Sequence, residues 1–284
     1  MDQTTLTKIA EILRTYVFNI ANAQAMLRLS TPVVLAALSA LITSRAGILN
    51  IAAEGMINFT TFSAVAAAYF LHSTPAGIAV GLLTGVGVAA FFALFSLKFR
   101  ANIIVMGIAI NIFAVSATMF LCRATFKQAG AFTDPSIVGL PLVTIPILHD
   151  IPVVGPLLGQ HSPITYLVWV LVPLTTVFLY RTKWGLRLRS VGENPQAAET
   201  LGVNVERMRF AAIMASGVFA ALAGIYLSLS HLQMYSDRMA AGRGFMGMSA
   251  NTFGNGEPIP VFFASLLFGI VDAISWRLHA ERIM

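Results

Sequence analysis

Two carboxylates fall inside apolar stretches of the sequence, where an ionisable side chain is rare and usually has a structural or functional role. Glu54 stands in NIAAEGM, and Asp272 stands in LLFGIVDAI near the end of the chain. A carboxylate at membrane depth costs at least about 2.5–3.5 kcal/mol, so it is normally paired, hydrated or protonated. Glu54 is therefore either an acceptor that fixes broken backbone near Asn50 and Gly55 or a pathway residue. Asp272 is predicted to be structural, pairing with an arginine or with Ser and Asn neighbours.

Glycine and asparagine interrupt two apolar regions, one at residues 47–58 and the other within residues 232–257. Irregular backbone at membrane depth survives only when it is buried in protein or lines a wet cavity. The second region is therefore either re-entrant or a plain external loop. Paired glycine-broken segments in the two halves of a transporter indicate the substrate route. The predicted pathway residues are Asn50, Glu54, Gly55, Asn58, Asn111, Gly242, Arg243, Gly244, Phe245 and Asn251.

Three polar residues on the segment 102–122 have two possible roles. Asn111, Ser116 and Thr118 could face the same route, and hydrogen bonding between helices is the favoured alternative. The remaining reactive side chains predict neither a catalytic nor a metal site. The five histidines stand near segment ends without a ligand-spaced pair, and Cys122 is a lone thiol in an apolar run. An intramembrane enzyme would need a nucleophile and a base, or a metal cluster, and the sequence offers neither.

Composition defines the class of protein that must position these residues. The chain has 284 residues, of which 57% are hydrophobic and only 11% charged. A soluble domain is nearer 45–50% apolar and about 25% charged, so a polytopic membrane protein is predicted. The fold class is an all-α transmembrane helical bundle with broken or re-entrant segments, in a single domain, 1–284. The seven predicted crossings are 25–44, 52–72, 76–97, 102–122, 164–181, 208–230 and 258–276.

The distribution of Lys and Arg predicts the orientation of the bundle. With Arg45 on the cytoplasmic side, alternating crossings place 98–101, 182–207 and the C-terminus there as well, and the N-terminus outside. That side then collects 11 basic residues and the other side 7. Residues 1–24 are predicted to form an interfacial amphipathic helix or a first helix packed on the bundle. Residues 124–163 contain six prolines, which predicts a folded external cap with short helical pieces rather than one helix.

The polar stretch GENPQAAETLG, residues 192–202, separates two of the predicted crossings. Asn194 and Pro195 are a helix-start pair, and Gly202 stands where a left-handed residue ends a helix. A helix this short persists only when something holds it. It is either a tight connector against its own bundle or a docking piece whose face would be Ala197, Ala198 and Leu201.

Four blocks of the sequence, in order, resemble the permeases of simple-sugar and nucleoside ABC importers, which are related to ribose and branched-chain amino-acid permeases. The blocks are SRAGILNIAAEGM, TKWGLRLRSVGENPQAAETLGVNVERMRF running into ASGVFAALAGIYLSL, AAGRGFMGMSANTFG, and LLFGIVDAI. The resemblance runs from about residue 30 to 276. The sequence departs from the family pattern in two places. GNGEP, residues 254–258, replaces the family's usual stretch at that position. Family members also usually have one more hydrophobic helix after the block LLFGIVDAI.

The resemblance implies that 182–207 is a cytoplasmic coupling segment that seats on a separate ATPase. Its coupling residues would be Gly192, Glu193, Asn194, Pro195, Ala197, Ala198, Leu201 and Gly202. ATP and Mg²⁺ would sit on that partner, since this sequence lacks a G-x-x-x-x-G-K-[ST] loop.

The other implied partners are a second permease subunit, identical or not, and an external solute-binding protein. The location would be a bacterial cytoplasmic membrane, and nucleic acid is not an expected partner. The solute would be a nucleoside or a simple sugar. The alternative function is a proton-coupled secondary transporter that uses Glu54 or Asp272.

Overall fold

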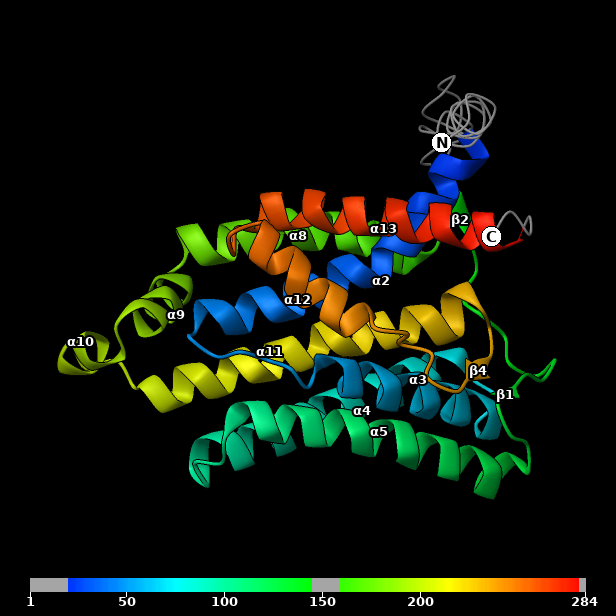
Figure 1. Ribbon diagram of the computed structural model, residues 1–284, viewed down its shortest axis with the longest axis horizontal. Helices are drawn as coiled ribbons and strands as arrows, with labels where there is room; N and C mark the ends of the chain where they lie inside the picture. Colours follow the sequence, from blue (N-terminus) through cyan, green and yellow to red (C-terminus); the bar gives the residue numbers. More distant parts are fainter. Residues whose placement is uncertain (1–19, 145–158, 281–284) are drawn as a thin grey trace, which may run out of the picture.

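The computed structural model describes residues 20–144 and 159–280, and it is a bundle of long helices (Figure 1). The membrane-length helices are α2 (Ile20–Arg45), α3 (Ala53–Phe70), α4 (Thr74–Ala93), α5 (Ile103–Phe126), α8 (Pro163–Arg181), α11 (Val205–Ile225) and α13 (Pro258–Ala280). The shorter ones are η1 (Leu94–Lys98), α9 (Lys183–Glu193), α10 (Pro195–Thr200), η2 (Tyr226–His231) and α12 (Arg243–Phe253). The predicted all-α class is confirmed.

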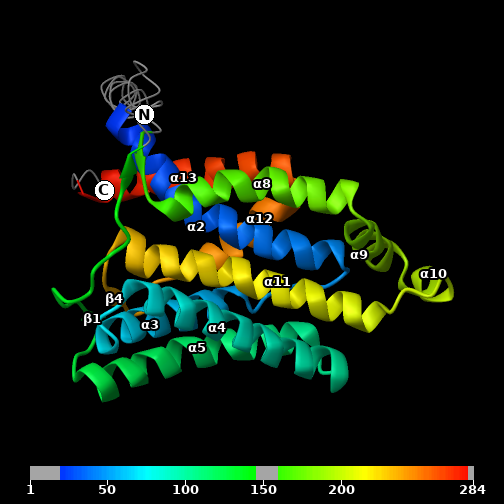
Figure 2. The same cartoon turned by 180° about the vertical axis from the view of Figure 1, so that it is seen from behind.

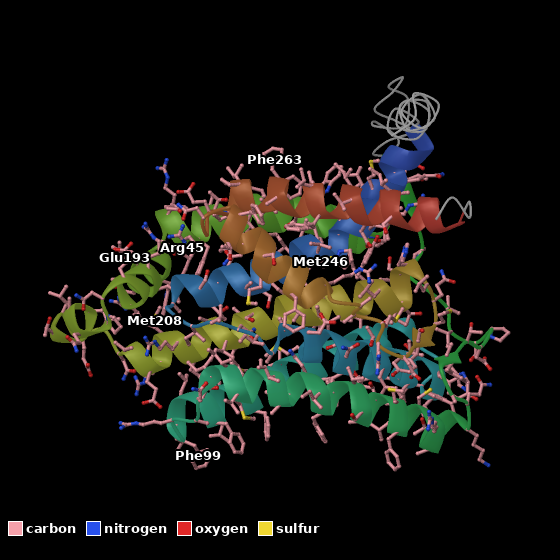
Figure 3. The ribbon with its side chains drawn as sticks, in the orientation of Figure 1. Arg45, Phe99, Glu193, Met208, Met246 and Phe263 are labelled. Carbon is pink, nitrogen blue, oxygen red and sulfur yellow. The ribbon has the colours of Figure 1, made fainter. Side chains whose placement is uncertain are left out.

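Six helices of the described chain are long and apolar enough to cross a bilayer: α2, α4 with η1, α5, α8, α11 with η2, and α13. They correspond to six of the seven predicted crossings. The other predicted crossing is α3, which has 18 residues and carries Glu54 and Asn58 on a largely buried surface. Its polar side chains face protein rather than lipid. By contrast, Phe99 and Phe263 point outward from opposite sides of the bundle (Figure 3).

Small residues let the central helices approach closely. A Cβ atom at Gly85 would meet Ala221 of α11, and one at Gly217 of α11 would meet Ala89 of α4. In the same way, a Cβ at Gly224 would meet the backbone of α3 at Ile57. These close approaches stabilise the bundle, because van der Waals packing between close backbones is a main force that holds helices together in lipid.

The chain from residue 237 onward differs from the predicted topology. Residues 237–242 turn back into the bundle from the end that carries β4 (Tyr235–Ser236), and α12 continues to the other end. There the Arg45 Nε donates to Gly256 O at 2.6 Å, so α12 finishes beside the end of α2. Residues 237–257 are therefore neither re-entrant nor a plain external loop. They form an additional, broken crossing.

This extra crossing reverses the direction of α13. Gly256 lies by Arg45 and Gly269 lies against Ser30, so α13 runs antiparallel to α2. The end of α13 then shares a side with the start of α2 and not with Arg45, and the predicted side of the C-terminus is wrong (Figure 1). The predicted count of 11 basic residues against 7 placed the C-terminal arginines on the side of Arg45, so this count no longer holds. The charge count therefore no longer carries the orientation.

The two ends of the bundle differ in structure. One end, called the coupling end after the predicted coupling segment that lies there, carries α9 and α10, and the polar groove beside them is lined by Lys98, Arg100, Glu199 and Arg209. Residues 98–101 and 182–207 thus share one end, as predicted. The opposite end carries two short antiparallel strand pairs. They are β1 (Ala131–Phe132) with β4, and β2 (Val143–Thr144) with β3 (Gln160–His161).

The predicted proline-rich cap is described only in part. Residues 127–144 and 159–162 contain strands and turns but none of the predicted short helices. An aromatic cluster ties this end together: Phe132 stacks on Phe126, and Tyr69 meets both rings edge-on. The amphipathic helix expected at 1–24 lies almost entirely outside the described residues.

Candidate solute pathway and coupling segment

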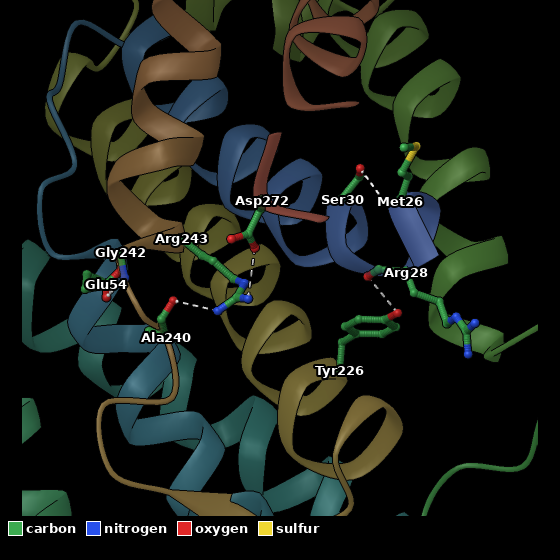
Figure 4. A network of polar contacts seen from close by, with 9 residues as sticks. All are labelled: Met26, Arg28, Ser30, Glu54, Tyr226, Ala240, Gly242, Arg243 and Asp272. Carbon is green, nitrogen blue, oxygen red and sulfur yellow. Dashed lines mark hydrogen bonds and ion pairs between the residues drawn. The ribbon is translucent and has the colours of Figure 1, made fainter. Parts of the chain in front are cut away.

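Glu54 links the two broken segments of the bundle, which are residues 46–52 before α3 and residues 237–257 around α12. It sits in the first turn of α3, which begins inside the bundle after the irregular residues 46–52. One carboxylate oxygen accepts from the Gly242 N–H at 2.8 Å (Figure 4). The other accepts from the Gly244 N–H at 2.7 Å. One turn further along α3, Asn58 Oδ1 accepts from the Ala240 N–H at 3.2 Å. The structure therefore shows Glu54 as a fixing acceptor, acting on the second broken segment rather than on its own.

The backbone at Gly242 explains why the start of α12 needs a carboxylate from another helix. Gly242 has φ 82°, a left-handed conformation that suits glycine, and it is the N-cap of α12 without a side-chain cap of its own. The first N–H groups of a helix lack intrahelical partners, and the helix dipole favours negative charge there. Glu54 supplies both the missing acceptors and the charge from another helix.

Arg243, the first residue of α12, pairs with Asp272 of α13. Its Nη2 lies 3.2 Å from Asp272 Oδ2, and both side chains are largely buried (Figure 4). Nη1 also donates to Ala240 O at 3.4 Å. The predicted structural role of Asp272 as the partner of an arginine is confirmed by this geometry. A buried charge is tolerated in a membrane protein when it is paired in this way.

Three asparagines hold the first broken segment and its surroundings. Asn111 of α5 accepts from the Gly55 N–H at 2.7 Å and donates to Ile51 O at 2.9 Å, so it bridges the start of α3. Asn50 donates to Ser216 Oγ at 2.6 Å. Asn251 donates to Ser44 Oγ at 3.1 Å. The favoured helix-to-helix role of Asn111 is thus present in the structure.

A groove of about 540 Å³ lies where α3, α5 and the second broken segment meet. It brings together five of the predicted pathway residues, namely Glu54, Asn58, Asn111, Gly242 and Phe245. Asn50, Gly55, Arg243, Gly244 and Asn251 do not line it and serve in packing or hydrogen bonding. Thr118 is buried and bonds back to its own helix.

Six further residues line the groove that were not among the predicted pathway residues. They are Ile108, Ile112, Val115, Ser116, Arg238 and Ala241, of which Ser116 was weighed in the sequence as either facing the route or bonding between helices. The first four follow helical spacing on α5 together with Asn111, and that spacing was the signal that could have found them. The groove therefore has an apolar wall from α5 and a polar edge from α3 and residues 238–242.

The polar stretch 192–202 is a short capped helix, as predicted. Asn194 Oδ1 accepts from the Ala197 N–H at 3.0 Å, Pro195 opens α10, and Gly202 has φ 79°. The expected docking face needs correction at one position. Ala198 is only 2% exposed because it packs against its own chain, whereas Leu201 is 83% exposed. The outward face of α10 is formed by Gln196, Ala197, Thr200 and Leu201.

Comparison with known proteins decides the family. Residues 22–279 match the family described as branched-chain amino acid transport system / permease component. The chain belongs to this permease family.

Named relatives of the permease cover most of its length. It is 34% identical to the nucleoside ABC transporter permease protein NupC of Lactococcus lactis over 88% of this chain and 80% of that protein. It is 34% identical to the guanosine ABC transporter permease protein NupQ of Bacillus subtilis, over 87% and 79%. The glucose ABC transporter permease protein TsgB13 of Haloferax volcanii is 25% identical, over 85% and 66%.

The predicted coupling segment of the permease contacts both broken segments through one set of residues. A Cβ atom at Gly192, in the last turn of α9, would collide with the carbonyl oxygen of Arg45. Gly47, which opens the first broken segment, packs against Gly192. Arg45 itself donates to Gly256 O at 2.6 Å and Asn255 O at 3.2 Å, at the end of the second broken crossing. We define Arg45, Gly47, Gly192, Asn255 and Gly256 as the coupling junction.

Proposed function

We propose that the chain is the membrane-spanning permease subunit of an ATP-driven importer for a nucleoside or a simple sugar. The carrying observation is the groove between α3, α5 and residues 238–242, built from two broken crossings in a chain of this permease family. The relatives named for nucleosides, guanosine and glucose support this solute class. Transport subunits of this kind carry no reaction of their own, so ATP and Mg²⁺ belong to a separate ATPase.

The lining of the groove suits a neutral solute with hydroxyl groups. Phe245 is 43% exposed and offers a ring face beside the apolar wall of α5. Asn58 and Ser116 offer hydrogen-bonding groups to sugar hydroxyls, and Arg238 adds donors at the edge. An apolar site with a few placed polar groups is the usual form of a small-molecule site.

The groove opens on one face of the permease, so a second permease subunit is proposed to close it. On that face α5 leaves large apolar side chains exposed, among them Ile108, Ile112 and Phe113. Exposed apolar residues in and beside a groove that also carries polar groups fit a protein contact as well as lipid. The two subunits would then place their grooves along one pathway between them.

Force from the ATPase is proposed to reach the groove through the coupling junction. Movement of α10 would pass through α9 at Gly192 to Arg45 and Gly47, and from there to both broken crossings. The Glu54 carboxylate holds those crossings together at the groove. Rigid packed elements with two arrangements are the physical basis of such coupling. An external solute-binding protein would deliver the solute at the opposite end.

The proposed orientation follows from the coupling segment rather than from the charge count. ATP is cytoplasmic, so α9 and α10 face the cytoplasm of a bacterial inner membrane. The starts of α2 and β1 and the end of α13 then face outside. The proton-coupled alternative is not favoured, because Glu54 holds two backbone amides and Asp272 pairs with Arg243.

Leu201→Asp should remove the ATPase from the purified complex while the permease still folds. The side chain is 83% exposed at the tip of α10, so the change costs the folded permease little. A buried apolar anchor in an interface is worth about 2 kcal/mol or more, or at least a tenfold loss of affinity. Co-purification of the ATPase from cells expressing both subunits measures the effect.

The matched control is Leu142→Asp, an exposed leucine at the opposite end of the bundle. It should co-purify with the ATPase like the unchanged protein. If Leu201→Asp also co-purifies normally, α10 is a connector within the bundle and not a docking helix.

Gly192→Ala should uncouple ATP hydrolysis from solute without preventing assembly. The added methyl collides with backbone at Arg45, and overpacking of this kind costs typically about 1–3 kcal/mol. It should push α9 away from the coupling junction while α10 stays exposed. Solute-stimulated ATP hydrolysis in nanodiscs should fall several-fold, with the basal rate retained. Gly87→Ala is the control, because a Cβ there meets nothing within 4 Å.

The function itself is tested by solute-stimulated ATP hydrolysis of the complex with its binding protein. Guanosine, other nucleosides and glucose are compared as solutes. Stimulation by one class names the solute, and transport of any of them without nucleotide would contradict the ATP-driven proposal.

A further inference from the structure

A narrow apolar cavity lies on the side of the bundle at the coupling end. It is separate from the groove between α3, α5 and residues 238–242, which we call the solute groove. It has a volume of about 180 Å³ and lies among α2, α8, α9 and α11. Its lining is entirely apolar: Ile42, Phe178, Trp184, Leu188, Met208, Ala211, Ala212 and Ala215. Figure 2 shows the face concerned, where α2 runs between α8 and α11 and α9 crosses their ends.

The helix over this cavity has the composition of a membrane-surface helix. The buried face of α9 is Gly185, Leu188 and Val191. On the outside, Trp184 and Leu186 are 60% and 61% exposed, beside the exposed Lys183 and Arg187. Large apolar side chains next to basic ones are typical of helices at the boundary between lipid headgroups and acyl chains.

The position of α9 along the bundle agrees with a place at the boundary between lipid headgroups and acyl chains. It begins two residues after α8 ends at Arg181, and α8 is a membrane-length helix. Trp is enriched at the membrane boundary, because its ring can contact acyl chains while its N–H bonds to water or headgroups. Lys183 and Arg187 stand one helical turn apart, so their cationic heads can meet one anionic group.

We infer that this surface binds an anionic phospholipid of the leaflet at the coupling end. Part of one acyl chain lies in the cavity between α8 and α11, over Ile42 and against Trp184. The headgroup phosphate is held by Lys183 and Arg187. The charge complementarity and the apolar cavity select a lipid over a free anion or an acidic protein segment, because neither of these would fill the cavity.

Trp184 can report on this site directly. The sequence has three tryptophans, and Trp169→Phe with Trp276→Phe leaves Trp184 as the only one. This full-length variant is placed in nanodiscs of phosphatidylcholine that contain an equal minor fraction of brominated phosphatidylglycerol or brominated phosphatidylcholine. Bromine on the acyl chain quenches tryptophan only at close range. The brominated phosphatidylglycerol should quench Trp184 several-fold more than the brominated phosphatidylcholine.

Removing the two charges should abolish this difference. Each basic residue near a membrane surface contributes about fivefold to the preference for anionic lipid, so Lys183→Gln with Arg187→Gln should bring the two lipids to equal quenching. Lys98→Gln with Arg100→Gln, at the same end but beside α5, should leave the difference intact. Ala215→Phe, which fills the cavity, should lower quenching by brominated phosphatidylglycerol.

Three results would overturn the inference. One is equal quenching by the two lipids before any charge is removed. Another is a preference that persists in the Lys183→Gln and Arg187→Gln protein. The third is a Trp184 that neither lipid quenches but whose emission changes when inorganic phosphate or the ATPase subunit is added, which would make the surface a free-anion site or a protein contact.

Discussion

Glu54→Ala should destabilise the permease strongly at the solute groove. The substitution leaves the N–H groups of Gly242 and Gly244 without acceptors where α12 begins inside the bundle. An unsatisfied buried donor destabilises the folded protein by about 1–3 kcal/mol, and this substitution leaves two such donors. The second broken crossing should then lose its fixed position against α3. Thermal unfolding in detergent should fall by several degrees, and solute-stimulated ATP hydrolysis should be lost.

A graded substitution separates this structural role from proton transport. Glu54→Gln keeps one oxygen for one glycine amide but presents an N–H₂ group to the other, so stability should fall by an intermediate amount. Glu257→Ala is the matched control, since it removes an exposed carboxylate just before α13. Its effect should be below about 1 kcal/mol. If Glu54→Gln were as stable as the unchanged protein yet transported solute without ATP, the carboxylate would be a proton site instead.

Much of this site could be predicted from the chemistry of single residues. Glu54 and Asp272 stood out because a carboxylate in an apolar stretch needs a partner. The glycine-rich regions stood out because broken backbone in a membrane needs a cavity or protein around it. Asn194 and Pro195 marked the start of α10 by local capping rules that do not depend on the rest of the fold. Each of these signals lies within a few residues of sequence.

The direction of α12 and α13 could not be predicted in the same way. Residues 237–257 are too polar and too rich in glycine to read as a membrane crossing. What fixes their path is contact between distant residues: Arg45 with Gly256, 211 positions apart, and Glu54 with Gly242, 188 apart. A window of local hydropathy contains neither contact. One missed crossing then reversed the predicted side of every residue after it.

The burial of Ala198 was missed for a different physical reason. A helix of six residues is under two turns long, so its sequence carries too few positions to define an inward face. The inward face is set from outside the helix, where the Val203 N–H donates to Ala198 O and α9 packs beside it. The docking surface is therefore readable only after the fold is known, and it centres on Leu201.

Asp272→Ala should destabilise the permease by about 3–5 kcal/mol, the usual cost of leaving one member of a buried ion pair alone. Arg243 would keep its charge next to the N-terminus of α12, where the helix dipole already disfavours a cation. Arg243→Met should cost less, because Asp272 is the more exposed partner at 17% against 8%. The free energy of unfolding, or the midpoint of thermal unfolding in the same detergent, measures both changes.

The double change Arg243→Met with Asp272→Leu decides what the pair does. Replacing a buried ion pair by apolar residues of similar volume is often neutral or stabilising, so the double variant should be more stable than Asp272→Ala. The difference from the sum of the Arg243→Met and Asp272→Leu single effects measures the coupling between α12 and α13. Restored stability without restored solute-stimulated ATP hydrolysis would show that the pair sets the position of α12 for transport. A double variant as unstable as the sum of its parts would contradict a pairwise interaction.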